Sequence, residues 1–388
     1  VDLTCEITKS DLAPIEIGAP AYTAQSPKIG LTQFALQLCQ EEFKEGNLLI
    51  SPFSILSALG MTANGAAGDT LAQIEALFQT DTASLNDYLM AYRQFLPQGD
   101  KYQVNIANSI WFKDKETLTV QPSFLQRVKD YYSANVYKAP FDESTKNSIN
   151  AWVKKETDGM IEQLLEEAPP ADAVVYLINA LSFDAEWEKA YEKTQIQAGT
   201  FTTAAGEKQK VEFMSSHEYS YLETPTATGF LKPYAEGKYA FAALLPKEKI
   251  EMADFLQSLD GESLQKLLAA PSDMEVIVRL PKFTVEYGAI LNQSLQDLGM
   301  VAAFDSEMAD FLPLAHSEDG NIFISKVVHQ AKIEVNEKGT KAGAVTAVEM
   351  TEGVALMEPK QVVLDRPFFY MIVDTEQNFP LFMGCCMA

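Results

Sequence analysis

Histidine is the side chain best suited to acid–base chemistry near neutral pH, and this sequence has three: His217, His316 and His329. None belongs to a His-Glu-x-x-His pattern, and the four cysteines form no Cys-x-x-Cys pair, so the sequence predicts no metal site. His329 lies in the apolar run "ISKVVHQAKIEV". We expect a buried histidine satisfied by hydrogen bonds there; a metal ligand or a general base is the alternative.

The patterns of nucleophilic and phosphate-transfer enzymes are also missing. There is no G-x-S-x-G elbow, no Walker loop and no G-x-G-x-x-G, and the glycines of "NGAAGD" have the wrong spacing to cradle a phosphate. Carboxylates are numerous, but no catalytic pair can be singled out. We therefore expect neither an enzyme nor a cofactor. An enzyme that carries no recognisable motif stays open as an alternative.

Charge and hydrophobicity disfavour nucleic-acid binding and a membrane span, respectively. The 388 residues include 30 Lys and Arg against 54 Asp and Glu, a formal net charge of −24. Nucleic-acid binding needs clustered basic residues, so we expect no nucleic-acid partner, and the acidity itself favours solubility. No apolar run reaches the ~18 residues of a membrane span, so we expect none.

The cysteines are too few for a disulfide scaffold. Cys39 lies in "LTQFALQLCQEEF", whose apolar residues have helical spacing, so we expect it in the core. Cys5 belongs to residues 1–27, which we interpret as an N-terminal tail. The chain begins at Val1 rather than at methionine, and we expect that either a signal peptide or a tag was removed.

The elements that would position a site run from helices to strands. Helical patterns cover residues 31–43, two stretches within 47–78, and 148–167 with an interruption at Gly159. Strand patterns cover 104–112 and 174–187, then "YAFAALLP", "MEVIVRLPKFTVEY", "KIEVNE" and "PFFYMIVD". This order predicts an α+β fold, and the even composition without a linker predicts one domain over residues 28–388.

One segment near the C-terminus, "EKGTKAGAVTAVEM" (337–350), is unusual. Its glycines and β-branched residues disfavour a helix. Read as a strand, its even positions from 340 to 348 are all small or apolar, whereas Lys341 and Glu349 lie on the other face. The segment therefore predicts a strand with one face that could be buried.

From about Lys28 to the C-terminus, the sequence resembles the serpin family in a series of motifs. In chain order they are "NLLISPFSILSALGMTANGAAGDT", "INAWVKKETDGMIEQLL", "LINALSFDAEWEKAY", "LPKFTVEYGAILNQSLQDLGMVAAFD", "ISKVVHQAKIEVNEKGT", "VVLDRPFFYMI" and "PLFMG". Any one of them is weak evidence, but all of them in this order are very specific.

The resemblance implies a serpin fold: a large central β-sheet, two smaller sheets, eight to nine helices and an exposed reactive-centre loop at about residues 338–361. It also implies suicide inhibition of a serine protease, in which the cleaved loop enters the central sheet while the protease is still attached as an acyl-enzyme. We expect a metastable monomer, secreted or at the cell surface, that forms a covalent complex with its target protease. A non-inhibitory carrier or chaperone is the alternative, and a bacterial source is left open.

The resemblance assigns roles to three groups of residues. They are the breach at the top of the central sheet (Glu337, Lys282, Trp187), the shutter that controls sheet opening (Ser51, Ser54, Asn179, His329), and the hinge of the loop (Gly339, Thr340, Ala342, Gly343, Ala344). Two positions depart from the family pattern: Lys341 replaces the usual acidic residue, and Gly343 replaces the usual alanine. Non-inhibitory relatives carry charged or bulky residues on the inward face, and this hinge does not, which favours an inhibitor.

The bait is expected within Gly353, Val354, Ala355 and Leu356. Counting forward from Glu337 gives Gly353 or Val354, whereas counting back from Pro367 gives about Leu356. No Lys or Arg lies between Lys341 and Lys360, so a trypsin-like protease has nothing to bind in its acidic pocket. The window favours an elastase-like or chymotrypsin-like target, and a subtilisin-like or cysteine protease remains open.

Overall fold

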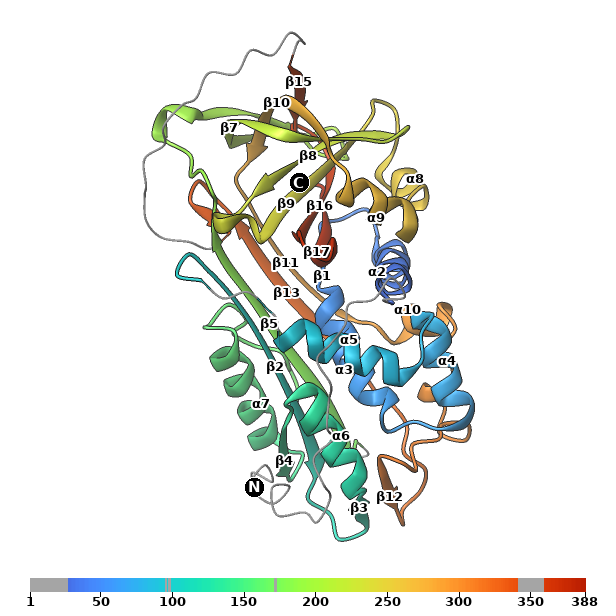
Figure 1. The fold of residues 1–388 in the computed structure, drawn as a ribbon. Helices are drawn as coiled ribbons and strands as arrows, with labels where there is room; N and C mark the ends of the chain where they lie inside the picture. Colours follow the sequence, from blue (N-terminus) through green and yellow to red (C-terminus); the bar gives the residue numbers. More distant parts are fainter. Residues whose placement is uncertain (1–26, 95, 97–98, 171–172, 341–358) are drawn as a thin grey trace.

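A computed structural model describes residues 27–94, 96, 99–170, 173–340 and 359–388 (Figure 1). The α-helices in this part of the chain are α2 (Lys28–Glu42), α3 (Pro52–Ala63), α4 (Gly68–Phe78), α5 (Thr82–Gln94), α6 (Pro122–Tyr132), α7 (Glu143–Glu156), α8 (Met252–Gln257), α9 (Gly261–Ala269) and α10 (Asn292–Asp297). Short 3₁₀ turns lie at Lys193–Gln195, Ala235–Gly237 and Ala302–Phe304.

The strands of a six-stranded sheet extend along the molecule (Figure 1). Its order is β11 (Phe283–Ile290), β13 (Val328–Val335), β14 (Gly339–Thr340), β5 (Val175–Glu186), β2 (Tyr102–Lys113) and β4 (Asn135–Ala139). Only the β2–β4 pair is parallel. The strands predicted at 104–112 and 174–187 are therefore neighbours in this central sheet.

A second sheet has nine strands. Along its path are β1 (Leu48–Ile50), β17 (Phe379–Cys386), β16 (Phe368–Asp374), β9 (Tyr239–Pro246), β8 (Ala227–Pro233), β7 (Lys208–Glu223), β10 (Ser272–Pro281) and β15 (Lys360–Val363), and β6 (Ile196–Thr202) also pairs with β7. The long strand β7 pairs with β10 over most of its length and with β8 at its end. It thereby joins the smaller sheets that the resemblance implied. A two-stranded sheet pairs β3 (Leu118–Val120) with β12 (Ala315–Ser317).

The helix expected over 148–167 ends earlier, at Glu156, so this prediction is wrong in its second half. Asp158 and Gly159 have positive φ values of 51° and 76°, which stop the helix. The Asn150 side chain then accepts hydrogen bonds from the backbone N–H groups of Leu164 and Leu165, at 2.9 and 2.8 Å. These bonds hold the following segment back against α7 in an irregular conformation.

The central sheet is covered on both faces. Alternate residues of β5 point to opposite sides: Tyr176 and Ile178 pack with Trp152 of α7, whereas Leu181 and Phe183 belong to the main core. In Figure 1, α7 lies over β2 and β5. Leu181 and Phe183 of β5 therefore face the same core as the buried residues of α3.

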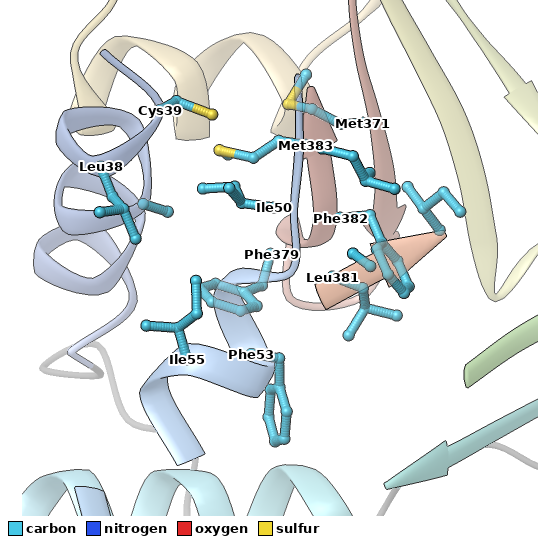
Figure 2. Close-up of a cluster of buried hydrophobic side chains, with 14 of the residues drawn as sticks. Leu38, Cys39, Ile50, Phe53, Ile55, Met371, Phe379, Leu381, Phe382 and Met383 are labelled. Atoms are coloured by element: carbon cyan, nitrogen blue, oxygen red, sulfur yellow. The ribbon is translucent and has the colours of Figure 1, made fainter. Parts of the chain in front are cut away.

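The main core continues from α2 and α3 into β16 and β17. Figure 2 shows Cys39 of α2 facing Met371 and Met383, with Phe53 of α3 near Phe379. Cys39 is fully buried, as the helical pattern predicted, and Cys39, Cys385 and Cys386 are buried thiols without a disulfide. This packing fixes α3 beneath the central sheet, where the shutter residues lie.

Candidate functional site

The start of the hinge already lies inside the central sheet. Thr340 is directly opposite Ala185 of β5 on one side and Val335 of β13 on the other, and it is buried. β14 thus separates β13 from β5, and in the described part of the chain these two long strands do not pair with each other. Gly339 is required at this point, because a Cβ added there would lie 2.0 Å from the Ala185 carbonyl oxygen.

The breach contains an ion pair that shares its lysine. Lys282 Nζ lies 2.9 Å from Glu337 Oε2 and 2.9 Å from Glu212 Oε2. The hydrogen bond from Lys282 holds the pKa of Glu337 below its ordinary value. Burial opposes the charge on Lys282, but its hydrogen bonds to Glu212 and Glu337 raise its pKa overall. Sequence reasoning brought Glu337 and Lys282 together but missed Glu212, because no pattern marks an acidic residue on β7.

Trp187 holds the turn that precedes the hinge. Its backbone N–H donates to the Lys338 carbonyl at 2.9 Å, and its indole Nε1 donates to the Asn336 carbonyl at 2.8 Å. Tyr191 N–H donates to the Glu337 carbonyl at 2.9 Å. Three successive carbonyls of the turn are therefore bound by the segment that follows β5.

Tyr234 is a further hinge contact that the sequence did not reveal. Its ring stacks on Trp187 with centroids 4.5 Å apart, and its hydroxyl lies 2.6 Å from the Thr340 hydroxyl. Both groups are buried, so this hydrogen bond satisfies the first hinge side chain that enters the sheet. A tyrosine after β8 has no sequence signal for this role, since the contact spans 106 residues.

The shutter residues Ser51 and His329 are in contact. Ser51 N–H donates to His329 Nε2 at 3.3 Å, and Ser51 Oγ donates to the Leu381 carbonyl at 3.0 Å. Burial lowers the pKa of His329 to about 4, against a hydrogen bond with the Leu49 backbone that raises it. His329 is therefore the buried, hydrogen-bonded histidine that its apolar surroundings predicted, and it is neutral at pH 7.

Asn179 is on β5 and His329 is on β13, the two strands that do not pair with each other in the described part of the chain. The Asn179 amide nitrogen donates to Asn108 Oδ1 at 2.8 Å, but its own oxygen is buried without a hydrogen-bond partner in the described part of the chain. Asn179, His329 and Ser54 all line a cavity of about 80 Å³ between β5, α3 and residues 322–329. Three of the four shutter residues thus surround a small space beneath the sheet, and the fourth, Ser51, contacts His329.

The rest of the predicted loop falls outside the described residues. This applies to the hinge residues Ala342, Gly343 and Ala344, and to the window Gly353, Val354, Ala355 and Leu356. Chain positions on either side are described: β14 ends at Thr340, and β15 begins at Lys360, parallel to β10.

A family model described as serpin (serine protease inhibitor) matches residues 30–388. The chain is a serpin. It is 30% identical to leukocyte elastase inhibitor A of Mus musculus over 373 residues, which are 91% of this chain and 97% of that protein. Leukocyte elastase inhibitor of Homo sapiens is 30% identical over 375 residues, with the same shares. The family is one of protease inhibitors rather than of enzymes, and its members act on target serine proteases.

Solved structures similar in shape include two states of one protein. The native state of tengpin, a thermophilic serpin, has a TM-score of 0.91 and 41% identity, with 98% of each chain covered. The latent state of tengpin has a TM-score of 0.85 at the same identity, covering 95% of this chain and 99% of that one. The likeness to the native state is therefore the greater of the two.

Among the described helices, none is long and apolar enough to cross a membrane.

Proposed function

We propose that this serpin is a suicide inhibitor that traps a serine protease as a covalent acyl-enzyme when its cleaved loop enters the central sheet. The observation that carries the proposal is the position of Thr340, which is already paired between β5 and β13. A strand that begins between two others can extend in the same register. Insertion of the cleaved loop would then extend β14 and would not have to form a new strand pairing first.

The register of Thr340 specifies the neighbours of each later residue. Moving two residues along the loop moves two residues back along each antiparallel neighbour, so Ala342 would lie between Phe183 and Ile333. Thr346, six residues on, would lie between Asn179 and His329. Because side chains alternate, these even-numbered residues would share the inward face of Thr340.

The space on that face supports small side chains. Phe183 and Ile333 are buried, and close-packed neighbours leave little volume for a large residue between them. Next to the shutter cavity, the hydroxyl of Thr346 could donate to the unpartnered oxygen of Asn179. The small inward residues predicted from the sequence therefore fit the site that they would enter.

The residues at 353–356 favour a target with a small or aliphatic specificity pocket. Similarity to leukocyte elastase inhibitors supports an elastase-like target, although 30% identity leaves the bait itself free to differ. A non-inhibitory carrier or chaperone is disfavoured by the small inward hinge.

We further propose that residues 28–388 form one domain and that the inhibitor acts as a monomer. Secretion stays a prediction.

The proposal is tested by incubating the protein with pancreatic elastase, chymotrypsin and trypsin, followed by denaturing electrophoresis and intact-mass analysis. We expect an SDS-stable complex with elastase or chymotrypsin, cleavage between residues 353 and 357, and no complex with trypsin. Cleavage without a complex for every protease would indicate a non-inhibitory serpin. A stable trypsin complex would contradict the proposed specificity.

A further inference from the structure

A buried ion pair lies behind the breach, outside the residues considered so far. Lys232 of β8 is 2% exposed and Glu218 of β7 is 7% exposed, and Lys232 Nζ lies 2.8 Å from Glu218 Oε1. Removing two charges from water is costly, and an apolar pair of similar volume would often be at least as stable. A fully buried pair at this place therefore needs a reason other than stability.

The surroundings of the lysine give that reason. Lys232 Nζ lies 4.5 Å from the ring centroid of Tyr191 and 5.3 Å from that of Trp187, and it donates to the Lys189 carbonyl at 3.4 Å. The ammonium group thus contacts three residues of the segment 187–191 through two cation–π interactions and one hydrogen bond.

Glu218 completes the same arrangement from the neighbouring strand. Its Oε1 also accepts a hydrogen bond from Ser216 Oγ at 2.6 Å, and Ser216 Oγ lies 3.2 Å from the Tyr191 hydroxyl. Burial alone would lower the pKa of Lys232, but Tyr191 and Glu218 raise it overall, so the lysine is charged. In the described part of the chain, no buried side-chain polar atom of this network lacks a hydrogen-bond partner, as a buried network requires.

The segment that the pair contacts is the one that binds the turn before the hinge. Trp187 and Tyr191 hold the carbonyls of residues 336–338, and that turn is the corner from which β14 leaves β13. We propose that Lys232 and Glu218 are positioning residues for inhibition: their ion pair holds the segment 187–191 so that the corner stays fixed while the loop extends. This inference rests on the proposed function, because a fixed corner matters only if the loop inserts.

The test compares Lys232→Met and Glu218→Gln with Glu42→Gln. Glu42 is a matched control, because it is also a buried carboxylate that accepts two hydroxyl hydrogen bonds, from Tyr287 and Ser294, but it does not contact the breach. The first measurement is hydrogen exchange at the amides of Trp187 and Tyr191 in the uncleaved protein, without protease. The second is the stoichiometry of inhibition with the protease that the wild type traps.

We expect exchange at both amides to be about tenfold faster in Lys232→Met, and the stoichiometry to rise about threefold or more because a loose corner slows insertion. Glu218→Gln should change the exchange rates and the stoichiometry in the same direction by a smaller amount. If Lys232→Met does not fold, Glu218→Gln is the deciding variant. Glu42→Gln should change neither, even at an equal loss of thermal stability.

Unchanged exchange, or faster exchange with an unchanged stoichiometry, would overturn the inference. A wild type that traps no protease would instead overturn the proposed function. The two failures are distinguishable, since the exchange measurement needs no protease.

Discussion

Lys282 binds two carboxylates, and only one of them belongs to the hinge turn. Glu337 immediately precedes the residues that enter the sheet, whereas Glu212 lies on β7 and is more exposed. A charge reversal at the two positions should therefore have different consequences, although it removes the same type of ion pair.

We predict that Glu337→Lys loosens the top of the sheet, because the new ammonium group would face Lys282 beside the hinge. Polymers or a latent form should appear several-fold faster on mild heating, as measured by native electrophoresis and residual inhibition. Glu212→Lys is the control and should have a much smaller effect. If Glu337→Lys remains monomeric and fully inhibitory, the ion pair does not hold the breach.

His329 provides a prediction on pH. Its pKa is about 4 in the folded chain and near 6.5 when unfolded, so the unfolded state binds more protons between these values. The contribution of His329 to stability is fully present above about pH 6.5, falls as the pH is lowered, and is lost below the folded pKa. The shift corresponds to roughly 3 kcal/mol at most.

The variant His329→Gln tests this prediction, since glutamine can still accept the hydrogen bond from Ser51. Unfolding midpoints of the two proteins should be compared from pH 7 to pH 4. We expect the difference between wild type and variant to shrink as the pH falls through this range. A difference that is constant with pH would mean that His329 does not titrate as its burial implies.

At the scale of elements, the two-residue strand β14 links the breach to the loop. Thr340 is its last described residue, 2% exposed, with its hydroxyl bound to Tyr234. A short strand in this place is a starting point for insertion, and it also makes the first inward side chain the most sensitive to size and charge.

We predict that Thr340→Arg converts the inhibitor into a substrate. The arginine must either bury an unpaired charge, at a cost of several kcal/mol, or keep the strand from forming. The bait lies about 13 to 16 residues further on, so cleavage should continue while deacylation overtakes insertion. The stoichiometry of inhibition should rise well above one, with cleaved monomer accumulating.

Lys341→Arg is the matched control, because position 341 has outward parity and already carries a positive charge. It should inhibit like the wild type. A near one-to-one trapping of protease by Thr340→Arg would show that the even positions do not face inward.

At the scale of the whole molecule, the central sheet is incomplete between β5 and β13 below Thr340, as far as the structure describes it. Inserting a strand there would add backbone hydrogen bonds and fill the cavity near Asn179. Cleavage of the loop should therefore release the chain into a more stable state.

We predict that cleavage within residues 353–357 raises the thermal midpoint. A gain of several kcal/mol corresponds to about 4 to 8 °C for a protein of this size, because its unfolding entropy is roughly 0.8 kcal/mol/K. Calorimetry of intact and cleaved protein measures it, and the cleaved form of Thr340→Arg should gain less. An unchanged midpoint in the wild type would favour a non-inhibitory carrier or chaperone.

The sequence by itself determined the order of elements and the family. The apolar run "YAFAALLP" and the helical spacing around Cys39 are local patterns, so they predicted β9 and α2 correctly. The helix expected to residue 167 failed because Asp158 and Gly159 adopt positive φ and end it, and because the Asn150 side chain binds the backbone of Leu164 and Leu165 in the segment that follows. The sequence also led to Glu337, Lys282 and His329, through motifs whose order is specific.

Only the tertiary structure brought Glu212, Tyr234, Glu218 and Lys232 to the breach. Each is on a strand of the nine-stranded sheet or, for Tyr234, directly after one, and each contacts residues distant in the chain, so no local spacing marks it. Tertiary structure also decided that Thr340 is paired on both sides, which gives the register of every residue that follows. The physical reason is that packing between distant strands, rather than periodicity within one strand, determines which polar groups can be buried together.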